Sequence, residues 1–342
     1  TKGVTAVSAK YGGFNELAFN TGAATAEGEA IGNGHPALKD KQVRVAIDHA
    51  IDKKALLDKV LRGHGTLATG IIPSLYADLH YEPAANDARG FDVAKANQIL
   101  DSAGYAKGGD GIRTMPNNPQ TKLSMRLHAR SESPDSQDYA AYIKDYLAAI
   151  GIGVTVSVVA NDNLTQIIGE GDYDMFLWGW VVEPDPDYQL STFTCSQRST
   201  KDGDTLTAGL SDSFYCNPEF DALYDKQKGE IDPAARAATV KQAQQLIYAD
   251  APYAMLNYYD DLQAYRSDRF TGLVAQPSDG GVLLFQWGIH TYLSIRPVAE
   301  SATESSNTGR NVLFGVGGAV VLAGLVVGFL MLRRRRTADE RE

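Results

Sequence analysis

Apolar residues recur along the chain with two different spacings, which predict alternating strands and helices. Alternation with polar residues, or a short run of β-branched and aromatic residues, predicts strands at 14–20, 123–129, 154–159, 173–181 and 253–259. Apolar residues three and four positions apart predict helices at 41–61, 92–103, 139–150, 164–168, 218–228 and 233–249. Strands that alternate with helices indicate an α/β domain with parallel strand pairings.

The segment 265–296 departs from this alternation, because it contains short strand-like and loop-like runs with little helix. Such a segment does not easily build a core alone, so we expect it to pack against something earlier in the chain, although no partner is evident in the sequence. Residues 297–311, rich in Ser, Thr and Glu, predict a flexible tether.

Residues 312–332 are apolar throughout and contain no charged side chain. As a helix, this run would be about 30 Å long, which matches the hydrocarbon core of a bilayer. Arg333–Arg336 follow directly. The positive-inside rule then predicts a single-pass membrane helix, with residues 1–311 outside the cell and 333–342 forming a basic cytoplasmic tail.

Composition limits the classes of function. The formal charge of −10 argues against a nucleic-acid-binding protein, which would normally present a basic face. The chain has two cysteines, Cys195 and Cys216. Two thiols alone do not identify a compartment, but on the oxidising outer side of a membrane we expect them to form a disulfide. Two unpaired thiols are the alternative.

Five stretches, in this order, resemble one known family. They are LAFNT with PALKDKQVRVAIDHAIDKKALLDKVLRG at 36–63, FDVAKANQILDSAGY at 91–105, YLAAIGIGVTV at 146–156, GDYDMFLWGWVVEPDPDYQL at 171–190, and NPEFDALYD at 217–225. The chain is similar to the solute-binding proteins of peptide and nickel ABC importers, the oligopeptide- and dipeptide-binding family 5. No single motif is decisive, but the order extends over most of the exterior part.

The resemblance implies a type II periplasmic-binding-protein-like lobe, with a mixed sheet and flanking helices. Chains of this family are considerably longer. Residues 1–14 are therefore expected to be the tail of a first lobe and the hinge, 15–264 the second ligand-binding lobe, and 265–296 the return to the first lobe. A C-terminal membrane helix departs from the family's usual pattern, which puts only the mode of attachment in doubt.

The resemblance also suggests which residues contact the ligand. In peptide-binding relatives an acidic residue just after a Gly-Trp pair holds the ligand's ammonium group. Glu183 occupies about that place, and Asp185 is the second choice. The alternative is an acidic turn stiffened by prolines and exposed to water. Trp178 and Trp180 point the same way along a strand, where they are expected either to form a wall of the cleft or to belong to the core.

Arg130 ends a predicted strand at the place where dipeptide-binding relatives carry an arginine that pairs with the ligand's carboxylate. Arginine suits such a bidentate contact, although an ordinary surface arginine is the alternative. His128, two residues earlier on the same face, is a second candidate for this site.

Signals for other kinds of chemistry are weak. Residues 32–37 mimic a dinucleotide-binding fingerprint but follow a loop and include a proline. Glu183, Asp185 and Asp187 alternate like a calcium loop but lack its glycine. The six histidines have no metal-ligand spacing, and no nucleophile elbow is present. We therefore expect no enzyme activity, no metal and no cofactor.

The sequence thus predicts a receptor that captures peptides outside the cell, in a Gram-positive bacterium, and delivers them to an ABC permease driven by an ATPase. Within the family, the alternatives are a nickel chelate, heme or an oligosaccharide as the bound solute. Outside it, the alternatives are a non-transporting sensor and a membrane-tethered surface hydrolase that uses Glu183 and Asp185 as a carboxylate pair.

Overall fold

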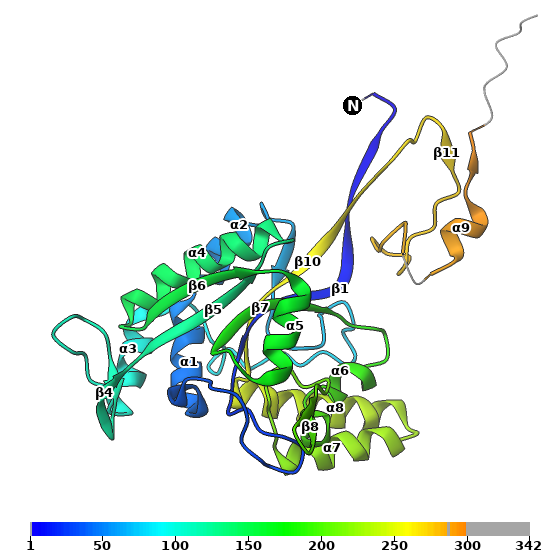
Figure 1. The fold of residues 1–342 in the computed structure, drawn as a ribbon. Coiled ribbons are helices and arrows are strands. Elements are labelled where there is room, and N and C mark those ends of the chain that lie inside the picture. Colours follow the sequence, from blue (N-terminus) through cyan, green and yellow to red (C-terminus); the bar gives the residue numbers. More distant parts are fainter. Residues whose placement is uncertain (1, 286–287, 299–342) are drawn as a thin grey trace, which may run out of the picture.

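A six-stranded mixed sheet forms the centre of the molecule. The computed structural model describes residues 2–285 and 288–298 (Figure 1). The strand order is β2 (Gly65–Leu67), β10 (Tyr253–Tyr265), β1 (Thr5–Phe19), β7 (Met175–Val181), β5 (Ser124–Arg130) and β6 (Gly153–Val159). The pairings of β5 with β6 and β7 are parallel, as predicted, whereas β1 pairs antiparallel with both β7 and β10.

Helices cover both faces of this sheet (Figure 1). One face packs against α1 (Lys41–Ala50), α2 (Lys53–Lys59), α3 (Val93–Ser102) and α4 (Pro134–Ala149). The other face packs against α5 (Asn161–Glu170), α6 (Asp187–Ser191), α7 (Pro218–Gly229) and α8 (Pro233–Asp250). Side chains along β1 point alternately to the two faces of the sheet. Leu17 and Phe19 belong to the first core, beneath α1–α4, and Phe14 and Ala18 belong to the second core, beneath α5–α8.

The predicted helix at 41–61 is wrong as a single element, because two helices occupy this range. Ile51 and Asp52 have non-helical backbone angles, with ψ of 119° and 83°. The Asp52 side chain accepts a hydrogen bond from the amide of Ala55 at 2.9 Å and so begins α2. An aspartate that caps a new helix therefore interrupts an apolar pattern that continues across the break.

The first half of β1 and the second half of β10 leave the sheet as a two-stranded ribbon, paired from Thr5 with Tyr265 to Ala9 with Asp261 (Figure 1). Residues 266–285 and 288–298 follow the ribbon and contain β11 (Phe270–Thr271), α9 (His290–Ser294) and β12 (Arg296–Pro297). Large apolar side chains are exposed there, including Leu293 at 77%. Part of this segment packs against the earlier chain as predicted, since the amide of Lys10 donates to the carbonyl of Gly280 at 2.9 Å, and Gln263 Oε1 accepts from the amides of Leu283 and Leu284. Its predicted return to a first lobe stays a prediction.

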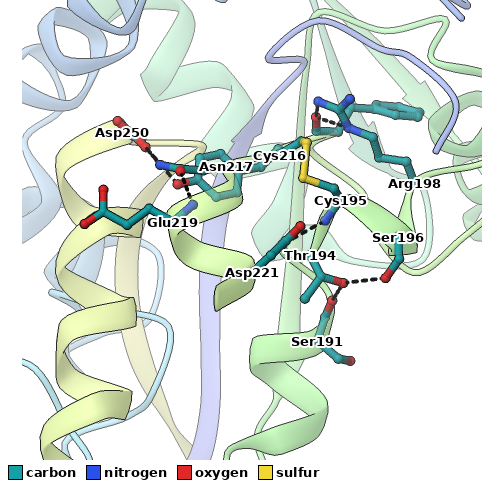
Figure 2. Close-up of a disulfide and its surroundings, with 12 residues drawn as sticks. Ser191, Thr194, Cys195, Ser196, Arg198, Cys216, Asn217, Glu219, Asp221 and Asp250 are labelled. Carbon is teal, nitrogen blue, oxygen red and sulfur yellow. Dashed lines mark hydrogen bonds between the residues drawn. A yellow bond between two sulfur atoms is a disulfide. The ribbon is translucent and has the colours of Figure 1, made fainter. Parts of the chain in front are cut away.

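Smaller elements lie in the connections. Two hairpins, β3 (Thr114–Met115) with β4 (Asn118–Lys122) and β8 (Thr200–Asp202) with β9 (Thr205–Thr207), pair antiparallel. Two 3₁₀ turns are η1 (Pro36–Lys39) and η2 (Cys195–Gln197). The predicted disulfide is confirmed, because Cys195 and Cys216 are bonded (Figure 2). It joins η2 to the residue before Asn217, which caps α7 through a hydrogen bond from the amide of Glu219.

The predicted membrane segment at 312–332 lies outside the described residues, as does most of the predicted tether at 297–311. Within residues 2–285 and 288–298, no helix has the length and apolar character needed to cross a bilayer.

Candidate functional site

A groove of about 630 Å³ opens where β5 ends and α4 begins. In open sheets, ligands bind beyond the carboxyl ends of parallel strands, so this is the expected place for a site. The groove is bounded by residues of β1, α2, β5, α4, β7 and β10, which include Asn15, Lys59, Arg62, His64, Arg130, Ser133, Asp135, Asp138, Tyr139, Trp178, Tyr259 and Asp260.

Arg130 is the last residue of β5, and its guanidinium carbon lies 4.7 Å from the centre of the Trp178 ring. Its backbone amide donates to Ser136 Oγ at 3.1 Å, which joins the strand end to α4. Among the described residues, its Nε is buried without a hydrogen-bond partner, and no carboxylate forms an ion pair with it. A cation stacked on an aromatic ring with free donors is prepared to bind an anion.

Polar groups hold the floor of the groove together. Asn15 donates to Asn257 Oδ1 at 3.0 Å, and Asn257 donates to Tyr139 Oη at 2.7 Å. These bonds connect β1, β10 and α4 below the opening. Charges of both signs surround this floor, which suits a ligand that carries an ammonium group and a carboxylate.

A second hollow of about 420 Å³ adjoins the groove, since Tyr259 and Asp260 border both. Tyr11 borders the second hollow, with its ring 5.7 Å from that of Tyr259. Tyr76 follows Leu75, which borders this hollow, and its hydroxyl donates to the carbonyl of Val182 at 2.7 Å. Burial, the nearby Tyr11 and the charge of Glu183 together raise the pKa of Tyr76 to about 12.

The structure divides the predicted site residues between different surroundings. Both Trp178 and Trp180 pack against the second core. Trp178 also borders the groove, whereas Trp180 donates from Nε1 to Asp212 Oδ2 at 3.2 Å. Glu183 is exposed in the turn after β7, next to Tyr76, and does not border the groove.

Two further candidates are occupied or enclosed. Asp185 pairs with both terminal nitrogens of Arg236 on α8, at 2.7 and 2.9 Å, and these hydrogen bonds lower the pKa of Asp185. His128 is buried among the sheet residues, neither ring nitrogen has a partner among the described residues, and burial lowers its pKa. His128 does not border the groove. A ligand contact at Asp185 or His128 would therefore need a rearrangement.

Residues 1–201 match the family described as bacterial extracellular solute-binding proteins, family 5, middle part. The chain belongs to this family. Proteins similar to the chain include Protein XP55 of Streptomyces lividans, 33% identical over 69% of this chain and 41% of that protein. The oligopeptide-binding protein AppA of Bacillus subtilis is 30% identical over 65% of this chain and 39% of that protein. The chain therefore spans about two fifths of the length of these relatives.

Solved structures of family 5 proteins share the fold. AppA of Bacillus subtilis, in complex with a nonapeptide, aligns with a TM-score of 0.68 at 20% identity, over 87% of this chain and 53% of that one. A dipeptide-binding protein of Pseudoalteromonas sp. SM9913 in complex with Met-Leu aligns with a TM-score of 0.65 at 24% identity, over 87% of this chain and 51% of that one. NikZ of Campylobacter jejuni in complex with Ni(L-His) aligns with a TM-score of 0.63 at 21% identity, over 80% of this chain and 50% of that one.

Most of the groove was not predicted from the sequence. His64, Tyr259 and Asp260 come from elements far apart in the chain, and only the sheet brings them together. One available signal was the start of α4, because the residues after a parallel strand border the ligand site in open α/β sheets. That rule would have added Ser133 and Asp135 to Arg130.

Proposed function

We propose that this chain is the second lobe of a binding protein that captures short peptides outside the cell for an ABC importer. The observation that carries this proposal is Arg130, held on the Trp178 ring at the groove with no carboxylate partner among the described residues. A peptide carboxylate fits the free guanidinium donors. The relatives named for oligopeptide and dipeptide binding support the same class of ligand.

At the other end of the ligand, Glu183 is proposed to hold the ammonium group. It is exposed beside Tyr76, whose neighbour Leu75 borders the second hollow. A peptide that extends from Arg130 across Tyr259 would reach toward this edge. Asp185 is a weaker candidate because Arg236 already neutralises it.

The second lobe is proposed to be residues 15–264. Residues 1–14 would enter from a first lobe, and 265–296 would return to it. The ribbon of β1 and β10 supports this division, since both strands leave the sheet together beside the groove. The exposed apolar residues beyond the ribbon would then be covered by the first lobe. Closure of two lobes on a peptide would favour the form that docks on a permease.

The alternatives have less support. A nickel chelate, as in NikZ, also presents carboxylates and is the alternative ligand class for the same arginine. The groove is equally compatible with a non-transporting sensor. For a surface hydrolase the support is weakest, because Asp185 is held by Arg236 and Glu183 stands outside the groove.

Native mass spectrometry of the full-length protein tests the ligand class. We expect short peptides to co-purify and to exchange with added peptide. A bound sugar, heme or metal chelate in place of peptides would contradict the proposal.

Attachment to the membrane is proposed to come from 312–332, followed by the cytoplasmic Arg333–Arg336. The Gram-positive source stays a prediction. The full-length protein is expected to sediment with membranes after an alkaline carbonate wash, and a variant that ends at residue 311 is expected to stay in the supernatant. Sedimentation of both proteins alike would contradict an anchor at this segment.

A further inference from the structure

Glu16, in the inner half of β1, is fully buried, and neither of its carboxyl oxygens has a hydrogen-bond partner among the described residues. It pairs across the sheet with Trp178 of β7, so the two side chains share one face. The same tryptophan carries the guanidinium of Arg130 on its ring. A buried carboxyl without partners is costly to ionise, so burial favours the neutral form of Glu16, and the surrounding charges adjust this preference.

Titratable groups from three elements act on Glu16. Burial raises the pKa of Glu16, the negative charge of Asp212 in the loop between β9 and α7 raises it further, and Arg130 on β5 lowers it. On β10, Tyr253 and Tyr259 have pKa values raised first by burial and also by Glu16. Burial raises the pKa of Asp212 to about 6, although the hydrogen bonds that Asp212 accepts from Tyr253 and Trp180 lower it.

We propose that Glu16 is a positioning residue that makes carboxylate binding at Arg130 depend on a proton. This inference rests on the proposed function. While Glu16 is neutral, it does not oppose the positive charge that Arg130 offers to a ligand. Once ionised, Glu16 offsets that charge through the protein interior, where charges interact strongly, and a ligand carboxylate is held less tightly.

The direction of the pH dependence follows from linkage. Glu16 is neutral below its raised pKa and ionises as the pH rises through it. A carboxylate bound at Arg130 makes ionisation of Glu16 less favourable, so binding takes up a proton. The affinity for a peptide with a free carboxylate is therefore full at low pH and lower at high pH, and the groove prefers such peptides most strongly under acidic conditions.

The test compares the full-length native protein with Glu16→Gln, which is permanently neutral. Calorimetric titrations use peptides of two to five residues, and their C-terminal amides, from about pH 5 to about pH 9. As the pH rises, native affinity for the free acids should fall more than that of Glu16→Gln, by about tenfold once Glu16 is ionised. The amides should show the same pH profile in both proteins. Titration of the peptide ammonium is common to both proteins and cancels in the comparison.

Proton uptake gives a second measurement that needs no substitution. Titrations of the native protein in two buffers with different ionisation enthalpies should report a proton taken up with the free acids. Identical pH profiles in the native protein and Glu16→Gln overturn the inference, and so does binding by the native protein without proton uptake. If no peptide binds the native protein at any pH, the proposed function itself fails, which is a different result.

Discussion

Replacing Arg130 with alanine is expected to weaken the binding of a short peptide with a free C-terminus about 100-fold, because a charged partner in a partly desolvated pair is lost. Among the described residues, no other cation lies on the Trp178 ring, so no neighbour replaces the lost guanidinium there. Arg130→Lys should weaken binding less, since lysine keeps the charge but lacks the planar fork. Isothermal titration of the full-length protein measures both effects.

Lys122→Ala provides a matched control. It removes one positive charge on β4, where Lys122 pairs with exposed Asp110 and does not border the groove. Its affinity should equal that of the native protein. Peptides with an amidated C-terminus should bind native protein and Arg130→Ala with similar affinity. A loss of amide binding as large as that of the free acid would show that Arg130 supports the fold of the groove and does not contact the carboxylate.

The double variant Cys195→Ser and Cys216→Ser is expected to lower the free energy of unfolding by about 3 kcal/mol. The disulfide joins residues 21 positions apart, and its loss lets the unfolded chain explore more conformations. It also holds η2 beside α7, where the amide of Cys195 donates to Asp221 at 3.1 Å (Figure 2). Denaturant unfolding followed by tryptophan fluorescence measures the change.

Reduction of the native protein provides the comparison for this variant. A reductant should shift the native unfolding midpoint toward that of the double variant and leave the double variant unchanged. Equal midpoints for native and double-variant proteins without reductant would mean that hydrogen bonds around Asn217 and Asp221, and not the disulfide, hold this corner of the second core.

The strands and helices of the cores were largely predictable, because each has one or two buried faces that give a clear period. The outer halves of β1 and β10 were not. Residues 260–265 read DDLQAY, and here the apolar Leu262 is exposed at 60% while the polar Gln263 is partly buried, so no apolar alternation marks the strand. The short hairpins were missed for the same reason. Their side chains are mostly exposed, so local turn geometry determines them.

Arg130 and Trp178 could be predicted as site residues because each belongs to a motif with a recognisable position in the family. Glu16 could not. Its neighbours in the sequence are those of an ordinary half-buried strand, and only the antiparallel insertion of β1 between β7 and β10 encloses its carboxyl. Sheet order depends on pairings between distant segments, which local patterns do not specify.

The pairing of β1 with β10 also affects how the chain folds during synthesis. Thr5 lies beside Tyr265 in the ribbon, and β1 is central to the sheet. While the ribosome is still making residues 20–252, β1 has no β10 to pair with, and both cores lack a strand. Completion of the sheet therefore waits until β10 pairs with β1, and a contact between segments so far apart in the sequence slows folding.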